Sequence, residues 1–336
     1  MGGGRRPADR ALPARHRGDR PSPTAVSRPD DRNHPPPPED PTTVHRSRTP
    51  LAAVHAASST PAADTAVFLH GLGGWTHNWA ALIDLLRASV HCLALDLPGF
   101  GRSEPPPDGV VTVERLAAAV ADHLDRTGHR RVHLVGNSLG GLTALHLADR
   151  RPELVATLTL VSPVLPALPP PQALRVSLLA LPGAPRLYAR LLSARSPDRQ
   201  LDDLYGLVYA DPALIGAEQR AVEARERSRR AELPHAPGML AEGVRAVVRS
   251  HLRQGPSSAW HQAHRITVPT LLVYGRKDRL VPFRTAHRAY AAFRDARLLT
   301  LPGVGHAAMQ ERPAPVAAAI RALITDARRT PPTRAT

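Results

Sequence analysis

The sequence is almost without cysteine and lysine. Cys92 is the only cysteine in 336 residues, and Lys277 is the only lysine among 44 basic side chains. A single cysteine excludes a disulfide bond within the chain and argues against a metal site built from cysteines. Because Cys92 lies in an apolar run with the character of a strand, its simplest role is that of a small buried side chain. This cysteine usage is typical of a reducing compartment, and we predict a cytoplasmic protein.

Long hydrophobic runs are also missing. No stretch of about 18 uninterrupted apolar residues occurs, so we expect no transmembrane helix. The N-terminal stretch is charged and contains no apolar segment, which argues against a secretory signal peptide.

Arginine supplies nearly all of the positive charge, and the formal net charge is +15. A charge of this size attracts acidic surfaces. The arginines are nevertheless spread along the chain without a dense basic run, and so strong a preference for arginine over lysine fits a GC-rich codon composition. We therefore predict no nucleic-acid partner. No feature of the sequence predicts a particular oligomeric state.

Residues 1–42 differ in composition from the rest of the chain. They are rich in proline and arginine and hold few apolar side chains. Such a segment buries too little apolar surface to offset the entropy of ordering, so we predict a disordered tail.

Apolar strands then alternate with amphipathic helices. Expected strands fall at 65–69, 90–95, 132–135, 154–161, 270–274 and 297–301, with helices at 78–88, 112–124, 139–149, 283–293 and 314–327. This alternation predicts an α/β fold with a mostly parallel, doubly wound sheet.

The alternation is interrupted once. Residues 163–265 contain several helix-like segments and many prolines but no convincing strand. We therefore predict a sheet domain formed by residues 43–162 and 266–328, with 163–265 inserted as a helical lid.

A G-x-S-x-G pattern runs from Gly136 to Gly140, between an expected strand and an expected helix. In that context the pattern predicts a nucleophile elbow, a sharp turn that exposes the serine hydroxyl. Ser138 must then adopt strained backbone angles, and the two glycines are needed because a Cβ at either position would collide with neighbouring chain.

A serine hydroxyl is a poor nucleophile unless a base and an orienting group assist it. Asp278 and His306 each follow the end of an expected strand. The carboxyl ends of parallel strands gather at one edge of a sheet, so both side chains can reach Ser138 there. The chain order serine, aspartate, histidine is the order of α/β-hydrolases.

The chain resembles the α/β-hydrolases of the lidded type over about residues 62–326. The resemblance rests on His70-Gly71, the elbow, and the segments 96–103, 275–278 and 303–306. It implies Ser138 as nucleophile, His306 as general base and acid, and Asp278 as the carboxylate partner.

The same resemblance implies an oxyanion hole formed by the backbone N–H groups of Leu139 and Leu72. His70 is structural in resembling proteins, and we expect the Asp96 turn to be structural as well, without a catalytic role. Some relatives place the acid after the strand expected at 154–161. Here that strand ends in Val161-Ser162-Pro163 without a carboxylate, which favours Asp278.

Cofactor and metal signatures are missing. The glycine-rich loop at 71–74 lacks the G-x-x-x-x-G-K-[ST] pattern, and no G-x-G-x-x-G opens the first βαβ unit, so no nucleotide cofactor is expected. Histidines at helical spacing with carboxylate partners are also missing, and we expect no metal.

The predicted activity is hydrolysis of a carboxylic ester by a serine acyl-enzyme mechanism. The leucines of 163–265 favour a small-to-medium apolar small-molecule substrate. Alternatives within the fold are carbon–carbon bond hydrolysis, acyl transfer and perhydrolysis, and Gly136-Asn137-Ser138 is similar to the elbow of some carbon–carbon hydrolases. A non-catalytic binding module is a further alternative. The arginine-rich stretch 220–230, with Glu223 and Glu226, is expected to be a solvated helix face.

Overall fold

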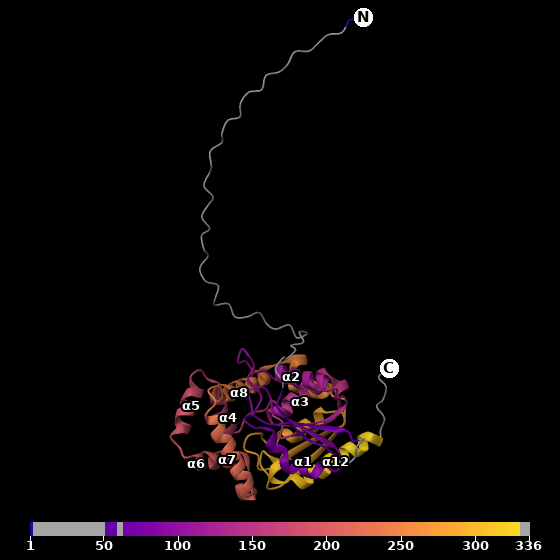
Figure 1. Cartoon of the computed structure of the whole chain (residues 1–336). Helices are drawn as coiled ribbons and strands as arrows, with labels where there is room; N and C mark the ends of the chain where they lie inside the picture. The colour runs from indigo at the N-terminus through magenta and orange to yellow at the C-terminus, as the bar shows by residue number, and fades with distance from the viewer. Residues whose placement is uncertain (3–50, 59–62, 330–336) are drawn as a thin grey trace, which may run out of the picture. The chain divides into compact units, whose positions relative to one another are not determined.

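A seven-stranded sheet organises the part of the chain that the computed structural model describes, residues 1–2, 51–58 and 63–329 (Figure 1). The chain divides into two units, 1–43 and 44–336, and every element described below belongs to the second. The disordered tail predicted for residues 1–42 lies, apart from residues 1–2, outside the described residues.

The sheet is parallel except at one edge. Its order is β1-β3-β2-β4-β5-β6-β7, and only β1 runs antiparallel to its neighbour. The strands are β1 (Ala53–Ala56), β2 (Thr65–Leu69), β3 (His91–Leu95), β4 (Val132–Asn137), β5 (Val155–Val161), β6 (Thr270–Gly275) and β7 (Ala296–Leu301). The predicted mostly parallel α/β sheet is confirmed.

Helices cover both faces of the sheet. Val67 and Leu134 point into one core cluster, whereas their neighbours Phe68 and Val135 point into the other. Successive strand residues face opposite sides, which is why buried parallel strands read as continuous apolar runs. The first cluster packs against α2 (Val113–Arg126), α3 (Leu139–Arg150) and α10 (Thr285–Ala292), and the second against α1 (Ala80–Leu86) and α12 (Pro313–Arg329).

Local capping explains where α2 begins. Thr112 is the N-cap residue, and its hydroxyl accepts a hydrogen bond from the backbone N–H of Arg115 at 3.2 Å. Glu114 stands in the first turn, where a negative charge favours the helix dipole. The helix start predicted from Thr112 is confirmed.

All helices between β5 and β6 belong to one long excursion of the chain without a strand. They are α4 (Pro171–Ser177), α5 (Ala184–Ser193), α6 (Pro197–Val208), α7 (Ala217–Ala231), α8 (Ala236–Leu252) and α9 (Ala259–Arg265), with short 3₁₀ turns η3 (Leu178–Ala180), η4 (Pro212–Leu214) and η5 (Gly255–Ser257). Figure 1 shows α4 to α8 on one side of the sheet layers. The last helix, α9, packs against α3 with Ala259 and Ala263 in the first core cluster.

The remaining short elements are η1 (Thr76–Trp79), η2 (Pro152–Leu154) and α11 (Ala308–Glu311). Within the described ranges, no helix combines the length and the apolar character needed to cross a bilayer.

Candidate active site

Ser138 occupies a sharp turn between β4 and α3. Its backbone angles are φ 55° and ψ −116°, which are unfavourable for a residue with a side chain. The turn is held because the Ser138 N–H donates to the carbonyl oxygen of Val161 at 3.0 Å. Ser138 is only 7% exposed to solvent, but its side chain lines a large cavity.

Two glycines make this turn possible. A Cβ at position 136 would lie 2.4 Å from the carbonyl oxygen of Gly140, and one at position 140 would lie 2.3 Å from that of Leu69. Both distances are far inside van der Waals contact. The steric reason given for the two glycines of the motif is therefore confirmed.

His306 and Asp278 are brought together from the loops after β7 and β6. The imidazole Nδ1 lies 2.9 Å from Asp278 Oδ2, and both side chains are buried. Because an ionised carboxylate only accepts, Nδ1–H must be the donor, and Nε2 is left free to take a proton. Both residues lie, as expected, in loops that follow the ends of strands, and the two side chains meet. Their catalytic roles stay predictions.

The Asp278 carboxylate is held ionised. Burial alone would raise its pKa, but the His306 imidazole and two backbone N–H groups lower the pKa below its usual range. Asp278 Oδ1 accepts from Leu280 at 2.8 Å and from Val281 at 2.9 Å. These bonds fix the carboxylate so that it orients the imidazole.

The loop that carries His306 is tied to its surroundings by Glu311, a residue that the sequence reasoning missed. Glu311 Oε1 accepts from the N–H of Gly305 at 2.7 Å, and Oε2 accepts from Ala210 at 3.0 Å. In addition, the N–H of His306 donates to the carbonyl oxygen of Val208 at 2.8 Å. The end of α6 therefore helps to place the histidine.

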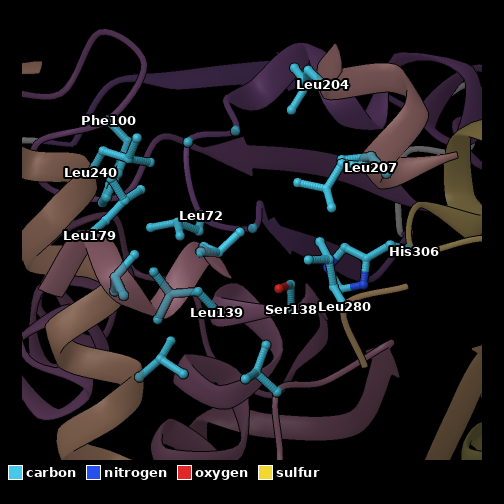
Figure 2. Close-up of a pocket in the computed structure, with 18 of the residues that line it drawn as sticks. Leu72, Phe100, Ser138, Leu139, Leu179, Leu204, Leu207, Leu240, Leu280 and His306 are labelled. Atoms are coloured by element: carbon cyan, nitrogen blue, oxygen red, sulfur yellow. The ribbon is translucent and has the colours of Figure 1, made fainter. Parts of the chain in front are cut away.

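Ser138 and His306 open onto one cavity of about 1010 Å³ (Figure 2). Within the described ranges, the serine hydroxyl makes no hydrogen bond to the imidazole; such bonds are often long in unliganded sites and tighten when substrate binds. Most of the lining is apolar, and Figure 2 labels Leu72, Phe100, Leu139, Leu179, Leu204, Leu207, Leu240 and Leu280 around it.

Leu72 and Leu139 line the same cavity as Ser138. Leu139 is the first residue of α3, so its N–H has no partner inside the helix. Neither N–H group has an acceptor in the part of the chain that the structure describes. Both donors are therefore available to a developing oxyanion, and their role in an oxyanion hole stays a prediction.

His70 and Asp96 hold backbone rather than face the cavity. His70 Nε2 accepts from the N–H of Leu97 at 3.0 Å, so Nδ1–H donates to the carbonyl oxygen of Gly71 at 2.8 Å. Complete burial lowers the pKa of His70, which is consistent with a neutral ring. Asp96 accepts from the N–H groups of Thr76 and Arg102. These contacts account for the structural roles expected of both residues.

The expectation that 220–230 is a solvated face was wrong for its two glutamates. Glu223 and Glu226 on α7 are 7% and 3% exposed. Glu223 Oε1 accepts from Trp75 Nε1 at 3.2 Å and from Asn78 Nδ2 at 3.0 Å. The helix turns this face toward the core, so the two acids bind partners there.

Glu226 organises a second set of contacts across the same interface. It forms ion pairs with Arg229 and Arg230, each at 2.7 Å. Arg230 also donates to the carbonyl oxygens of Gly73 and Gly74, and Arg229 to that of Gly101. Burial would raise the pKa of Glu226, but the two guanidinium groups lower it below its usual range. Helix α7 is therefore hydrogen-bonded to the loop that contains Leu72.

Metal-binding groups are not assembled in the described ranges: no three His, Cys, Asp or Glu side chains lie together in a way that could hold an ion. The polar groups of the cavity are instead hydroxyl, amide, imidazole and guanidinium side chains and the carboxylate of Glu223, set in apolar walls.

The fold and this arrangement define the class of α/β proteins with a serine on a strand-to-helix elbow. A family model described as alpha/beta hydrolase fold matches residues 66–313. The chain therefore belongs to the α/β hydrolase fold family, as its sequence motifs indicated.

Relatives within the family differ in their reactions. The chain is 30% identical over 251 residues to the dihydrolipoyllysine-residue acetyltransferase component of an acetoin cleaving system from Cupriavidus necator, with 74% of this chain and 60% of that protein covered. It is 31% identical over 265 residues to a candidate carbamate hydrolase of Pseudomonas syringae pv. syringae, covering 78% and 94%. The meta-cleavage product hydrolase of Pseudomonas fluorescens IP01 has a similar fold, with a TM-score of 0.67, 17% identity, and coverage of 82% and 94%.

Proposed function

We propose that the protein is a serine hydrolase that cleaves carboxylic esters with an apolar small-to-medium acyl or alcohol group. One observation carries the proposal: Ser138, on a strained elbow, shares a cavity with His306, whose Nδ1 is hydrogen-bonded to the buried Asp278. In the proposed reaction, Ser138 Oγ attacks the carbonyl carbon and His306 Nε2 takes its proton. The backbone N–H groups of Leu72 and Leu139 stabilise the oxyanion.

The tetrahedral intermediate then collapses. The leaving alcohol takes the proton from His306, and an acyl ester on Ser138 remains. Water attacks that ester with His306 again as the base, which releases the carboxylic acid and restores the serine. Asp278 stabilises the imidazolium at each stage and stays ionised, consistent with its lowered pKa. No bound cofactor enters these steps.

The helices between β5 and β6 support the apolar part of the proposal. Residues from α4, α5, α6 and α8 line the cavity together with the loops of the sheet, and most are leucine, valine or alanine. We therefore propose that 163–265 acts as a lid that forms the substrate pocket, with the sheet domain at 43–162 and 266–328. A reducing, cytoplasmic location is proposed from cysteine usage, since the one cysteine, Cys92, is free and buried.

Other reactions of the family are alternatives to ester hydrolysis. The elbow sequence Gly136-Asn137-Ser138 favours carbon–carbon bond hydrolysis as the second candidate, and Asn137 lines the cavity beside the serine. Acyl transfer, perhydrolysis and carbamate cleavage would use the same serine nucleophile. Their products differ from the free acid that ester hydrolysis releases, so product analysis distinguishes them.

A panel of p-nitrophenyl esters with increasing acyl length tests the proposal. We expect turnover by the wild type, none above background by Ser138→Ala, and stoichiometric labelling of the wild type by a fluorophosphonate probe. A wild-type protein that neither turns over any ester nor takes up the probe would show a non-catalytic binding module. Probe labelling without ester turnover would point to one of the other reactions.

A further inference from the structure

Exposed leucines cover the outside of α4, η3, α5 and the residues that flank them, and η3 contacts both helices. Of the twelve large hydrophobic side chains exposed in the described ranges, six lie in this short stretch and each is more than half exposed. They are Leu168, Leu174, Leu178, Leu181, Leu187 and Leu191. We call this set the outer leucine face. Contiguous exposed apolar patches of this kind mark interaction sites on soluble domains.

The outer leucine face is distinct from the lining of the cavity. None of its six side chains lines the cavity, whereas other residues of the same helices do, including Val176, Leu179, Tyr188 and Leu192. On α5, Leu187 and Leu191 stand one turn apart on one side, and Tyr188 and Leu192 stand on the next. The pocket therefore explains the inner leucines and leaves the outer ones without a partner.

Arginines accompany the outer leucines, and acids do not. Residues 163–195 contain four arginines, Arg175, Arg186, Arg190 and Arg195, and no aspartate or glutamate. Within the described residues, Arg195 pairs with Asp203, but Arg175, Arg186 and Arg190 form no ion pair. On α5, the exposed Arg186 and Arg190 are spaced by one turn beside Leu187 and Leu191, and Arg190 also lines the cavity.

Acidic side chains on the neighbouring helices do not offset this charge. Asp203 and Asp202 on α6 are engaged by Arg195 and Arg220, and Glu242 on α8 is engaged by Arg245 and Arg249. Asp198, in the first turn of α6, is the one acid of these two helices without an ion pair within the described residues, against three such arginines. The surface around the outer leucine face is therefore positive. Helix α5 lies at the outer edge of the helical layer, at the left of Figure 1, where a flat partner can reach it.

We propose that the outer leucine face docks on the surface of a bilayer that contains anionic lipid. A row of leucines beside a row of arginines is the pattern of a helix that lies in a membrane interface. The leucines enter the acyl boundary, and the arginines bind lipid phosphates while their stems cover apolar surface. A second copy of the chain is a poorer partner, because a symmetric contact would place three unpaired arginines against three more. Docking does not depend on the proposed hydrolysis.

Vesicle co-sedimentation of the full chain tests the proposal. We expect binding to phosphatidylcholine vesicles that contain phosphatidylglycerol and little binding to phosphatidylcholine alone. Leu187→Ser/Leu191→Ser should weaken binding about tenfold or more, because both leucines leave the acyl boundary. Arg175→Gln/Arg186→Gln should weaken it and reduce its dependence on salt. Leu85→Ser, at an exposed leucine of α1, is the matched control and should bind as the wild type does.

A second measurement does not depend on whether the serine variant folds. Tryptophan placed by Leu187→Trp should shift its emission to shorter wavelength with the phosphatidylglycerol vesicles, and Leu85→Trp should not. Equal binding of the wild type and the leucine variant, or no binding by the wild type, would overturn the proposal. So would concentration-dependent dimers that dissociate in Leu187→Ser/Leu191→Ser without any vesicle binding.

Discussion

At the scale of single residues, the proposed site contains three side chains with separate structural supports. Ser138 is fixed by a strained turn, His306 by its backbone bond to Val208, and Asp278 by two backbone N–H groups. Each support survives removal of the other two side chains. Substitutions at the three positions should therefore affect turnover more than stability.

The first prediction concerns these three residues as a unit. Ser138→Ala and His306→Ala should each lower kcat for a p-nitrophenyl ester by roughly four to six orders of magnitude. The double variant should be scarcely worse than either single variant, because each change already abolishes the nucleophilic step. Steady-state kinetics measure both effects, with thermal melting as the control for folding.

Asp278→Asn separates orientation from nucleophilicity. It leaves serine and imidazole in place but removes the charge that stabilises the imidazolium, so its loss of kcat should be similar or smaller. Near-wild-type hydrolysis by Asp278→Asn at normal melting temperature would mean that another carboxylate serves the histidine.

At the scale of elements, charged side chains attach α7 to the loops of the sheet, and its apolar packing against the second core cluster is limited to Ala224. Glu226 gathers Arg229 and Arg230, which reach the carbonyl oxygens of Gly73, Gly74 and Gly101. An interface of this kind responds to pH and to single substitutions in ways that a leucine interface does not.

The second prediction is the pH dependence of this interface. The pKa of Glu226 is lowered in the folded protein, so its contribution to the free energy of unfolding is present above its ordinary value of 4.5. That contribution is lost as pH falls through the lower, folded-state pKa. Glu226→Gln should cost about 1–3 kcal/mol at pH 7.

Urea unfolding of both proteins at several pH values measures this difference. The gap between wild type and Glu226→Gln should shrink as pH falls below about 4.5. A gap that stays constant down to pH 3, in proteins that still unfold in two states, would show that the Glu226 charge adds nothing.

The third prediction assigns Arg230 as a positioning residue. Arg230 donates to the carbonyl oxygens of Gly73 and Gly74, which follow Leu72 in the chain, and the Leu72 N–H is the proposed oxyanion donor. Arg230→Met should loosen that donor, which acts mainly on the transition state. We expect kcat to fall about tenfold while KM changes little.

Arg225→Met provides the matched control, because Arg225 is exposed on the same helix. The rate of fluorophosphonate labelling should follow kcat across the series, since the phosphonyl oxygen uses the same donors. A rise in KM at constant kcat would instead make Arg230 a substrate-binding residue.

At the scale of the whole molecule, the sheet and the helices between β5 and β6 share one cavity, while residues 1–42 are set apart by composition. The fourth prediction follows from that composition. Deleting residues 1–42 should leave the melting temperature and ester kcat unchanged, because the segment holds too little apolar surface to join the core. A large fall in melting temperature of the truncated protein would show that the tail is docked.

The sequence by itself determined the succession of strands and helices along the chain. It also indicated which loops carry the candidate site residues. Apolar runs with strand and helix spacing are local signals, and the β2, α2 and α3 starts agree with them within a residue or two. Ser138, Asp278 and His306 could be named because a parallel sheet gathers the carboxyl ends of its strands whatever lies between them.

Only the tertiary structure decided which polar residues of the helical segment face inward. Glu223 and Glu226 lie among arginines at helical spacing. A helix face exposed to solvent and a helix face that binds neighbouring loops can show the same pattern. Glu311 gave no signal because its partners, Gly305 and Ala210, are backbone groups brought to it by the fold. Burial depends on which face meets a neighbour, and spacing along one helix does not contain that information.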